Sequence, residues 1–160
     1  MSRVGVLFVC LGNICRSPLA DGLFADYVRR QHREHLIEVD SAGTSGWHDG
    51  KLPDPGSIRV AKNRGLDITY QRSRKLIEED FDRFDVIVAM DGSNRANIEA
   101  LRAPREGQLV MLRDFDPQGA GGDVPDPWEK GDEAFVEVYE MVERCMPGLF
   151  DYVERVATKG

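Results

Sequence analysis

Residues 4–17, with the sequence VGVLFVCLGNICRS, decide the fold of this chain. Val4–Cys10 is a continuous apolar run rich in valine, a pattern typical of a strand buried on both faces. A short loop, Leu11–Arg16, follows it, and Ser17-Pro18 then predicts a helix with serine as its N-cap and proline at its first position. Apolar residues continue at helical spacing to about Gln31. A strand, a tight loop and a helix in this order open an α/β fold.

The alternation of strand and helix patterns continues to the end of the chain. Further strands are expected over 37–42, 85–90 and 110–112, and further helices over 54–65, over 93–101 and from about 132 onward. The last helix carries an apolar stripe made of Phe135, Val138, Tyr139, Val142 and Leu149. Pro147-Gly148 should kink or break it. The pattern predicts a single doubly wound α/β domain over residues 1–160, with about four parallel strands flanked by helices.

Composition restricts the class of protein. The chain has 160 residues, of which 41% are hydrophobic and 31% charged, as in ordinary globular proteins. Its net charge of −7 argues against nucleic acid as a partner, so a bound anion needs a local site of positive potential. The longest apolar run, Val6–Leu11, is too short to span a membrane, and the N-terminus does not resemble a signal peptide. We therefore expect a cytoplasmic protein without a membrane partner.

The three cysteines and three histidines also argue against a secreted protein and against a metal site. Cys10 and Cys15 share one short loop, which is unlike the disulfide framework of a secreted protein. The histidines are scattered and the chain has no CxxC pattern, which argues against a zinc site. Cys145 fits the apolar stripe of the last helix and is predicted to be structural.

The loop after the first strand has the pattern C-x5-R-S, from Cys10 to Ser17. In α/β folds this loop is a favoured ligand site, because its backbone N–H groups and the positive end of the following helix attract anions. Gly12 and Asn13 tolerate the left-handed backbone that so tight a loop needs. These features predict a phosphate-binding loop.

Three side chains in and beside the loop suit phosphoryl chemistry. Cys10 at the rim of the positive loop should ionise readily to the nucleophilic thiolate. The planar guanidinium of Arg16 matches two phosphoryl oxygens, and the Ser17 hydroxyl can hydrogen-bond the sulfur as it leaves. A buried core cysteine is the alternative for Cys10, and the spacing to Arg16 makes it the weaker one.

A phosphatase acting on an aryl phosphate also needs an acid, because a phenolate is a poor leaving group. Asp123, Asp126 and Asp132 all lie on the long segment 113–132. Asp126 is preferred because prolines on both sides stiffen its backbone. Without Cys10 and Arg16, a simple turn aspartate would be the better interpretation.

The sequence CLGNICRS resembles the loop of the low-molecular-weight protein tyrosine phosphatases, and the resemblance extends along the whole chain. The other similar stretches are Asp40-Ser41-Ala42-Gly43 with Trp47, Ala89-Met90-Asp91 with Ser93-Asn94, and Asp126-Pro127-Trp128. The resemblance implies that Cys10 is the nucleophile, Arg16 the phosphate clamp and Asp126 the general acid, without metal or organic cofactor. Tyrosine-phosphorylated proteins or peptides would be the partners, and inorganic phosphate a product.

The remaining site residues follow from the same comparison. The phosphate would be held by the loop residues Leu11, Gly12, Asn13, Ile14, Cys15 and Ser17. Asn13, Ser17 and Ser41 would support the loop, where Gln71 stands in place of a histidine of many members. Glu129 replaces an aromatic residue that is phosphorylated in some members.

The substrate slot and the second loop cysteine each leave an alternative open. Trp47 and Trp128 would form the walls of an aromatic slot with Ile14 at its base, although both tryptophans could instead be core residues. Cys15 is either a packing residue or a partner that forms a reversible disulfide with Cys10 and makes the enzyme redox-sensitive. Asp91 is either a surface turn residue or part of the rim.

Four other functions are compatible with parts of this pattern. An arsenate reductase would need further cysteines, and only Cys145 is left. A phosphoarginine phosphatase would carry threonine, by resemblance, where this chain has Ile14. A receiver-type signalling module, with Asp91 as phosphoacceptor, needs acidic residues where Cys10 stands, and a flavin module would want hydroxyl residues in the loop.

Overall fold

Four parallel strands form one sheet in the computed structural model, which describes residues 3–159. They are β1 (Val4–Cys10), β2 (Ile37–Gly43), β3 (Val86–Ala89) and β4 (Leu109–Met111), in the order β2-β1-β3-β4. The apolar run around Val6 makes β1 a central strand, paired in register with β2 on one side and β3 on the other. The predicted fold class is therefore confirmed.

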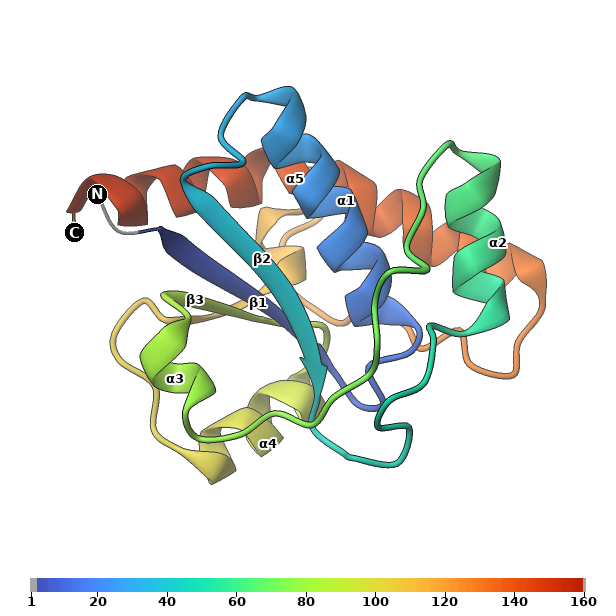
Figure 1. Cartoon of the computed structure of the whole chain (residues 1–160), viewed down its shortest axis with the longest axis horizontal. Coiled ribbons are helices and arrows are strands. Elements are labelled where there is room, and N and C mark those ends of the chain that lie inside the picture. Colours follow the sequence, from blue (N-terminus) through green and yellow to red (C-terminus); the bar gives the residue numbers. More distant parts are fainter. Residues whose placement is uncertain (1–2, 160) are drawn as a thin grey trace.

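Helices cover both faces of this sheet (Figure 1). They are α1 (Arg16–Arg30), α2 (Pro55–Asn63), α3 (Asp80–Arg83), α4 (Gly92–Leu101) and α5 (Asp132–Lys159), with a 3-10 turn, η1 (Leu112–Phe115), after β4. Figure 1 shows α1 and α5 above the sheet and α3 and α4 below it. No helix within residues 3–159 combines the length and the apolar character needed to cross a membrane.

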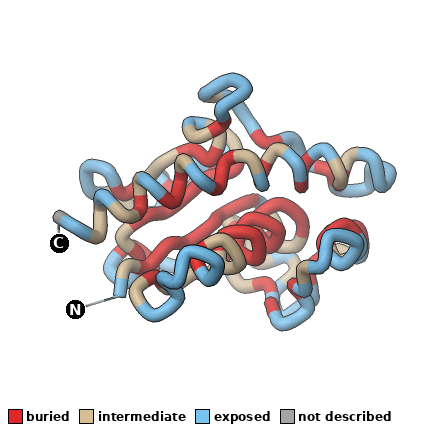
Figure 2. Tube along the Cα trace, turned by 90° about the horizontal axis from the view of Figure 1, so that it is seen from above, coloured by how far each residue is buried: buried red, intermediate tan, exposed pale blue. Residues whose placement is uncertain are grey.

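The alternation of β1 side chains builds two cores. Val6, Phe8 and Cys10 face the larger core with α1 and α5, whereas Leu7 and Val9 face the smaller core with α3 and α4. Figure 2 shows these buried segments in the middle of the molecule, with exposed turns outside. Cys10, as the last residue of β1, is thereby held at the carboxyl edge of the sheet, where ligands bind in such folds.

The predicted N-cap of the first helix is wrong, and so is the predicted break in the last helix. Among the described residues, α1 begins at Arg16 with Cys15 at the N-cap position and no side-chain cap. Ser17 lies inside the helix, because its hydroxyl is hydrogen-bonded to Asn13 in the loop. Of the kink or break predicted at Pro147, the break is wrong: α5 continues through the proline, since buried residues on both sides, such as Cys145 and Leu149, hold it against the core.

Gly148 has a packing function beside that proline. A Cβ at this position would lie 3.3 Å from the carbonyl oxygen of Phe115, and a glycine there lets α5 approach η1 closely. The Pro147-Gly148 pair is thus accommodated by tertiary contacts that offset the loss of one helical hydrogen bond.

Candidate active site

The loop after β1 is closed by one left-handed residue. Asn13 has φ 57°, as predicted for its type. Gly12 is not in the left-handed region and serves close packing instead, because a Cβ there would lie 3.0 Å from Cδ2 of His48. The loop is fastened to its surroundings by backbone bonds, including one of 2.7 Å from the Asp54 N–H to the Ile14 carbonyl.

A pocket at this edge of the sheet gathers most of the predicted site residues. Its lining residues are Cys10, Leu11, Gly12, Ile14, Cys15, Arg16, Trp47, His48, Asp126 and Trp128. Residues from three separate stretches of the chain, 10–16, 47–48 and 126–128, thus line one pocket. Asn13, Ser17 and Ser41 lie behind the loop and are buried.

Arg16 is held from one side and free on the other. Its Nη1 donates to Asp91 Oδ2 at 2.6 Å and to the Val124 carbonyl at 2.9 Å. Its Nε is buried without a hydrogen-bond partner among the described residues, and its Nη2 lies 3.8 Å from Asp126 Oδ2. The Nε–Nη2 edge is therefore available to an anion, in the fork geometry that matches two phosphoryl oxygens.

The residues around Arg16 stabilise its positive charge. Burial disfavours the guanidinium, but the nearby Cys10 and Asp91 outweigh that effect and raise the pKa of Arg16. The pocket therefore keeps a fixed positive charge over the accessible pH range, in a chain whose net charge is −7.

Asp126 is the carboxyl group placed for proton transfer. Its Oδ1 accepts a hydrogen bond of 3.0 Å from the Trp128 N–H, and its side chain remains 45% exposed at the pocket. Asp123 instead accepts from the Gly92 N–H at the start of α4, and Asp132 pairs with Arg59. Of the three aspartates weighed from the sequence, Asp126 lines the pocket and the other two have capping or surface roles.

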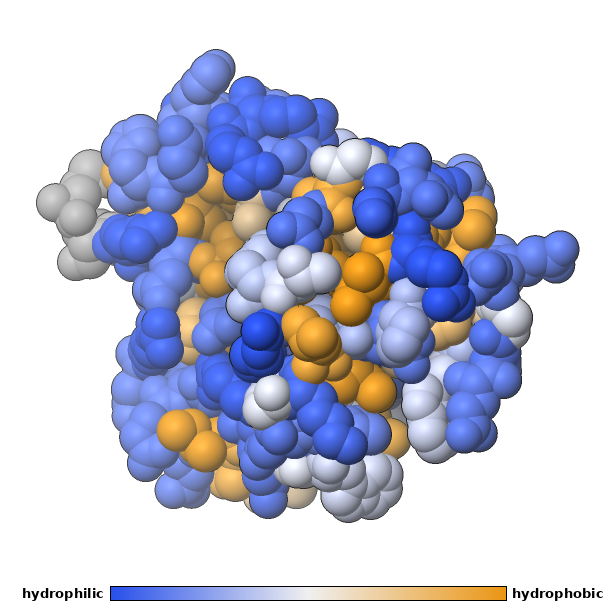
Figure 3. Space-filling view, turned by 45° about the vertical axis from the view of Figure 1, so that its right-hand side comes forward, coloured by the Kyte–Doolittle hydropathy of each residue, from blue (hydrophilic) through white to orange (hydrophobic). Residues whose placement is uncertain are grey.

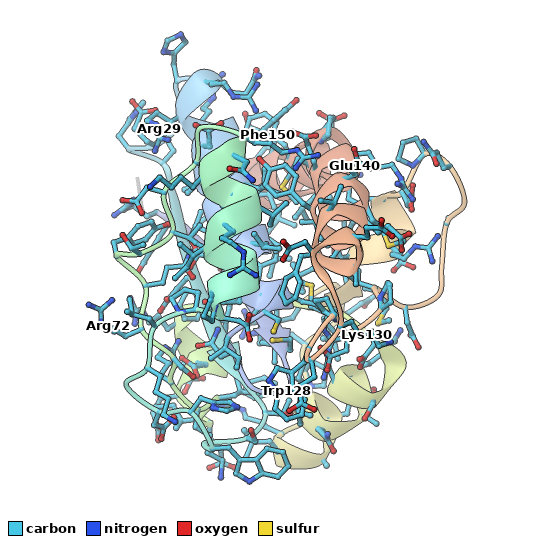
Figure 4. The ribbon with its side chains drawn as sticks, turned by 90° about the vertical axis from the view of Figure 1, so that its right-hand side faces the viewer. Arg29, Arg72, Trp128, Lys130, Glu140 and Phe150 are labelled. Carbon is cyan, nitrogen blue, oxygen red and sulfur yellow. The ribbon has the colours of Figure 1, made fainter. Side chains whose placement is uncertain are left out.

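Both tryptophans stand at the mouth of the pocket. Trp47 is 75% exposed and Trp128 49% exposed, so neither is a core residue. Figure 4 shows Trp128 on the segment that enters the N-terminal end of α5, with Lys130 near the same end. Two exposed indoles on a pocket that also contains Ile14 form an apolar opening suited to a flat ring.

A sequence model of a protein family, described as Low molecular weight phosphotyrosine protein phosphatase, matches residues 5–159. The chain belongs to this family. Its low-molecular-weight phosphatase relatives include a low molecular weight protein-tyrosine-phosphatase of Streptomyces coelicolor, 42% identical with 90% of each chain covered. Another is the Bacillus subtilis phosphatase YfkJ, 36% identical over 95% of this chain and 97% of the relative.

Solved structures of the phosphatase family have the same fold. The crystal structure of YfkJ matches with a TM-score of 0.90 at 33% identity, covering 97% of each chain. A protein tyrosine phosphatase from Entamoeba histolytica, crystallised with Hepes in the active site, gives a TM-score of 0.89 at 33% identity, over 95% of this chain and 97% of that one.

The loop of this low-molecular-weight phosphatase is supported by a buried amide and hydroxyl network. The Asn13 side-chain amide donates to Ser17 Oγ at 2.8 Å and to Ser41 Oγ at 2.9 Å. Gln71 Oε1 accepts from Ser41 at 3.5 Å, while its Nε2 donates to the Pro18 carbonyl at 2.9 Å. Gln71 thus completes, with a group that does not titrate, the network in which the sequence resemblance expected a histidine.

The same network leaves the hydroxyl hydrogen of Ser17 available to the Cys10 sulfur. Ser17 Oγ lies 3.0 Å from Cys10 Sγ and already accepts from Asn13. Its hydroxyl hydrogen is therefore free to point at the sulfur, where it would stabilise a thiolate.

The sequence did not decide between a surface turn and a site position for Asp91, and it did not identify His48 as part of this phosphatase site. Asp91 both orients Arg16 and caps α4 by accepting from the Asn94 N–H. Its position directly after β3, at the same sheet edge as Cys10, is the signal that could have identified it. His48 lines the pocket beside Trp47 and packs against Gly12, a contact that no sequence spacing indicates.

Cys15 and Cys145 are buried thiols with raised pKa values. Cys10, Cys15 and Cys145 are all free and buried in the described structure. Burial, with contributions from Asp54 and Cys10, raises the pKa of the Cys15 thiol, and burial raises that of Cys145 to about 12. Cys145 donates to the Met141 carbonyl within α5, which agrees with its predicted structural role.

A buried carboxyl group, Asp21 on α1, lies near the supporting network. It is 4% exposed, and burial together with the nearby charge of Asp40 raises its pKa to about 7, against the opposing hydrogen bonds from Ser41 and Tyr70. The folded protein therefore binds this proton more tightly than the unfolded chain does. Below about pH 4 both states hold it, and stability should fall as the pH rises from about 4 to about 7.

Asp21→Asn should remove this part of the pH dependence. The unmodified protein should lose on the order of 4 kcal/mol in free energy of unfolding between pH 4 and pH 8 through Asp21, and the variant should not show this loss. Urea denaturation at each pH measures the difference. Asp151→Asn, at an exposed position on α5, is the matched control and should follow the unmodified protein. Parallel pH curves for Asp21→Asn and the unmodified protein would contradict a raised pKa at this site.

Proposed function

We propose that this protein hydrolyses phosphotyrosine through a phosphocysteine formed on Cys10, with Arg16 as phosphate clamp and Asp126 as general acid and base. The observation that carries the proposal is the buried Nε of Arg16, which has no hydrogen-bond partner among the described residues, in the pocket that Cys10 lines, next to an Nη2 whose ion-pair partner, Asp126, is 3.8 Å away. A buried guanidinium edge without a partner is costly unless an anion occupies it. Family membership and the match over residues 5–159 support the same assignment.

In the first step the Cys10 thiolate attacks phosphorus and an S–P bond forms as the P–O bond to the phenol breaks. Arg16 and the loop amides hold the equatorial oxygens, whose negative charge they match in the transition state as well as in the substrate. Asp126 gives its proton to the leaving phenolate oxygen, which lies on the exposed side of the pocket.

In the second step a water attacks phosphorus and the S–P bond breaks. Asp126, now a carboxylate, accepts the proton of that water, and inorganic phosphate is released. The Ser17 hydroxyl, 3.0 Å from Cys10 Sγ, stabilises the sulfur as it regains its negative charge. Neither step requires an oxidant or a reductant.

The opening of the pocket supports an aromatic leaving group. Trp47 and Trp128 are exposed and line the pocket together with Ile14 of the loop, so a phenyl ring gains apolar contact there. Phosphoserine is too short to bring its phosphorus to Cys10 past these side chains. We also propose that residues 1–160 form one domain and that the protein acts on tyrosine-phosphorylated proteins in the cytoplasm.

Phosphate release from phosphotyrosine, phosphoserine and phosphoarginine peptides tests this function. Ile14 offers no acceptor to a guanidinium, and an unsatisfied buried N–H costs ~1–3 kcal/mol, so we expect kcat/KM to favour phosphotyrosine over phosphoarginine by at least about fivefold. Ile14→Thr should shift this ratio toward phosphoarginine, while Ile77→Thr, at an exposed position outside the pocket, should leave it unchanged. Comparable kcat/KM on the two substrates in the unmodified protein would show that Ile14 is not the selector.

We propose in addition that Cys15 protects Cys10 from irreversible oxidation. Peroxide would convert the Cys10 thiolate to a sulfenic acid, and the Cys15 thiol in the same pocket would displace water from it to form a disulfide. After mild peroxide treatment, added thiol should restore activity to the unmodified protein but much less to Cys15→Ser. Equal recovery of the two proteins would make Cys15 a packing residue.

A further inference from the structure

A second groove lies next to the active site on the α4 side of the catalytic loop. We call it the Lys75 groove, and it has a volume of about 440 Å³. Its lining residues are Leu11, Thr44, Ser45, Lys75, Leu76, Asn97, Ala100 and Leu101. They come from the loop after β1, the segment after β2, the segment before α3, and α4.

The Lys75 groove is continuous with the active site. Leu11, the residue after the nucleophile, lines both the pocket and the groove. The Thr44 N–H donates to the Cys10 carbonyl at 2.9 Å, and the Ser45 N–H to the Leu11 carbonyl at 2.9 Å. The backbone of Lys75 is held by a parallel β-bridge to Gly43 at the end of β2, and its side chain is exposed. A peptide whose phosphotyrosine sits over Cys10 can therefore extend into a groove whose walls are fixed relative to that residue.

The Lys75 groove is positive in a negative protein. Its eight lining residues, all from the described part of the chain, include one cation, Lys75, and no carboxylate, although the net charge is −7. Other surface grooves mix the two signs: Asp67 lies with Lys62 in one, and acidic and basic residues share another. Within residues 3–159 no ion pair engages Lys75.

The other lining groups suit a peptide with a carboxylate. Asn97 provides a side-chain amide donor, and the Thr44 hydroxyl is buried without a partner among the described residues, whereas the Ser45 hydroxyl already donates to the Leu11 carbonyl at 3.1 Å. Leu11 and Leu101, each 38% exposed, offer apolar contact to the stem of a side chain. Figure 3 shows, on one face of the molecule, a largely hydrophilic surface with apolar residues gathered near its middle.

We propose that the Lys75 groove binds the peptide segment next to the phosphotyrosine and selects an acidic side chain there, paired with the Lys75 ammonium. This inference rests on the proposed phosphotyrosine phosphatase function and specifies its substrates further. The groove would make peptides with a nearby glutamate or aspartate better substrates than neutral ones, chiefly through KM, because the contact is the same in the bound substrate and in the transition state.

A set of phosphotyrosine peptides tests the proposal. Each peptide carries one glutamate in place of glutamine, at one of the three positions on either side of the phosphotyrosine. At the favoured position the glutamate peptide should exceed its glutamine partner by about two- to fivefold in kcat/KM, the range that an exposed ion pair supports, and added salt should reduce the difference. Each kcat/KM is divided by that of the same protein on p-nitrophenyl phosphate, so that a general change in activity cancels.

Lys75→Glu should abolish the preference or reverse it toward glutamine. Lys62→Glu, which makes the same charge change at an exposed lysine on α2, should keep the preference. An unmodified protein that cleaves all the peptides without distinguishing glutamate from glutamine would overturn the inference, as would a preference that survives in Lys75→Glu. A protein inactive on every aryl phosphate would instead refute the proposed function.

Discussion

Replacing Cys10 with serine should abolish phosphotyrosine hydrolysis, with a loss in kcat on the order of 10⁴-fold or more. The serine hydroxyl is a far weaker acid than a thiol, so the positive pocket formed by Arg16 and the loop amides would not ionise it at neutral pH. No S–P bond would then form. The measurement is phosphate release from a phosphotyrosine peptide under saturating conditions.

Two controls make the Cys10 result specific. Cys145→Ser is the matched exchange at a buried cysteine of α5, where a hydroxyl can still donate to the Met141 carbonyl, and it should retain activity. Cys10→Ser should still bind inorganic phosphate, because the free edge of Arg16 is unchanged. Full activity of Cys10→Ser would refute the covalent mechanism, and loss of activity on adding a chelator to the unmodified protein would refute a mechanism without metal.

Asp126→Asn should lower turnover of a phosphotyrosine peptide by ~10²-fold or more, the usual scale of general acid catalysis. Asparagine keeps the size and the acceptor for the Trp128 N–H but has no proton of suitable acidity for the phenolate. The loss should be smaller on p-nitrophenyl phosphate, whose leaving group is stable without protonation. The ratio of kcat on the two substrates is therefore the readout.

Asp123→Asn provides the matched control for that experiment. Asp123 lies on the same loop and accepts from the Gly92 N–H, a bond that asparagine can also accept. Its kcat ratio between the two substrates should equal that of the unmodified protein. If Asp123→Asn shows the substrate-dependent loss and Asp126→Asn does not, the general acid is Asp123.

Much of the fold and of the candidate site follows from local sequence. Val4–Cys10 predicts a buried strand because its apolar residues are consecutive, and Asn13 predicts a tight loop because it tolerates the left-handed backbone that it adopts there, whereas Gly12 serves close packing against His48. The cysteine, arginine and serine of that loop are close in sequence and therefore necessarily close in space. The choice of Asp126 over its neighbours likewise depended on two adjacent prolines.

Other features depend on contacts between residues far apart in the chain. Asp91 meets Arg16 across 75 residues, and Gln71 reaches the Pro18 carbonyl across 53, so no local pattern indicates either contact. Pro147 is tolerated within α5 because buried side chains on both sides outweigh the local preference for a break.

The sequence by itself determined the sheet, the catalytic loop and the class of chemistry, since these follow from residue types at short spacing. Only the tertiary structure decided which edge of Arg16 is free, how Gln71 completes the loop support and why Asp21 holds its proton. It also decided that Lys75 stands alone among uncharged groups beside Leu11. The physical reason is that hydrogen-bond satisfaction, burial and local charge are properties of packed surroundings, which distant segments of the chain assemble.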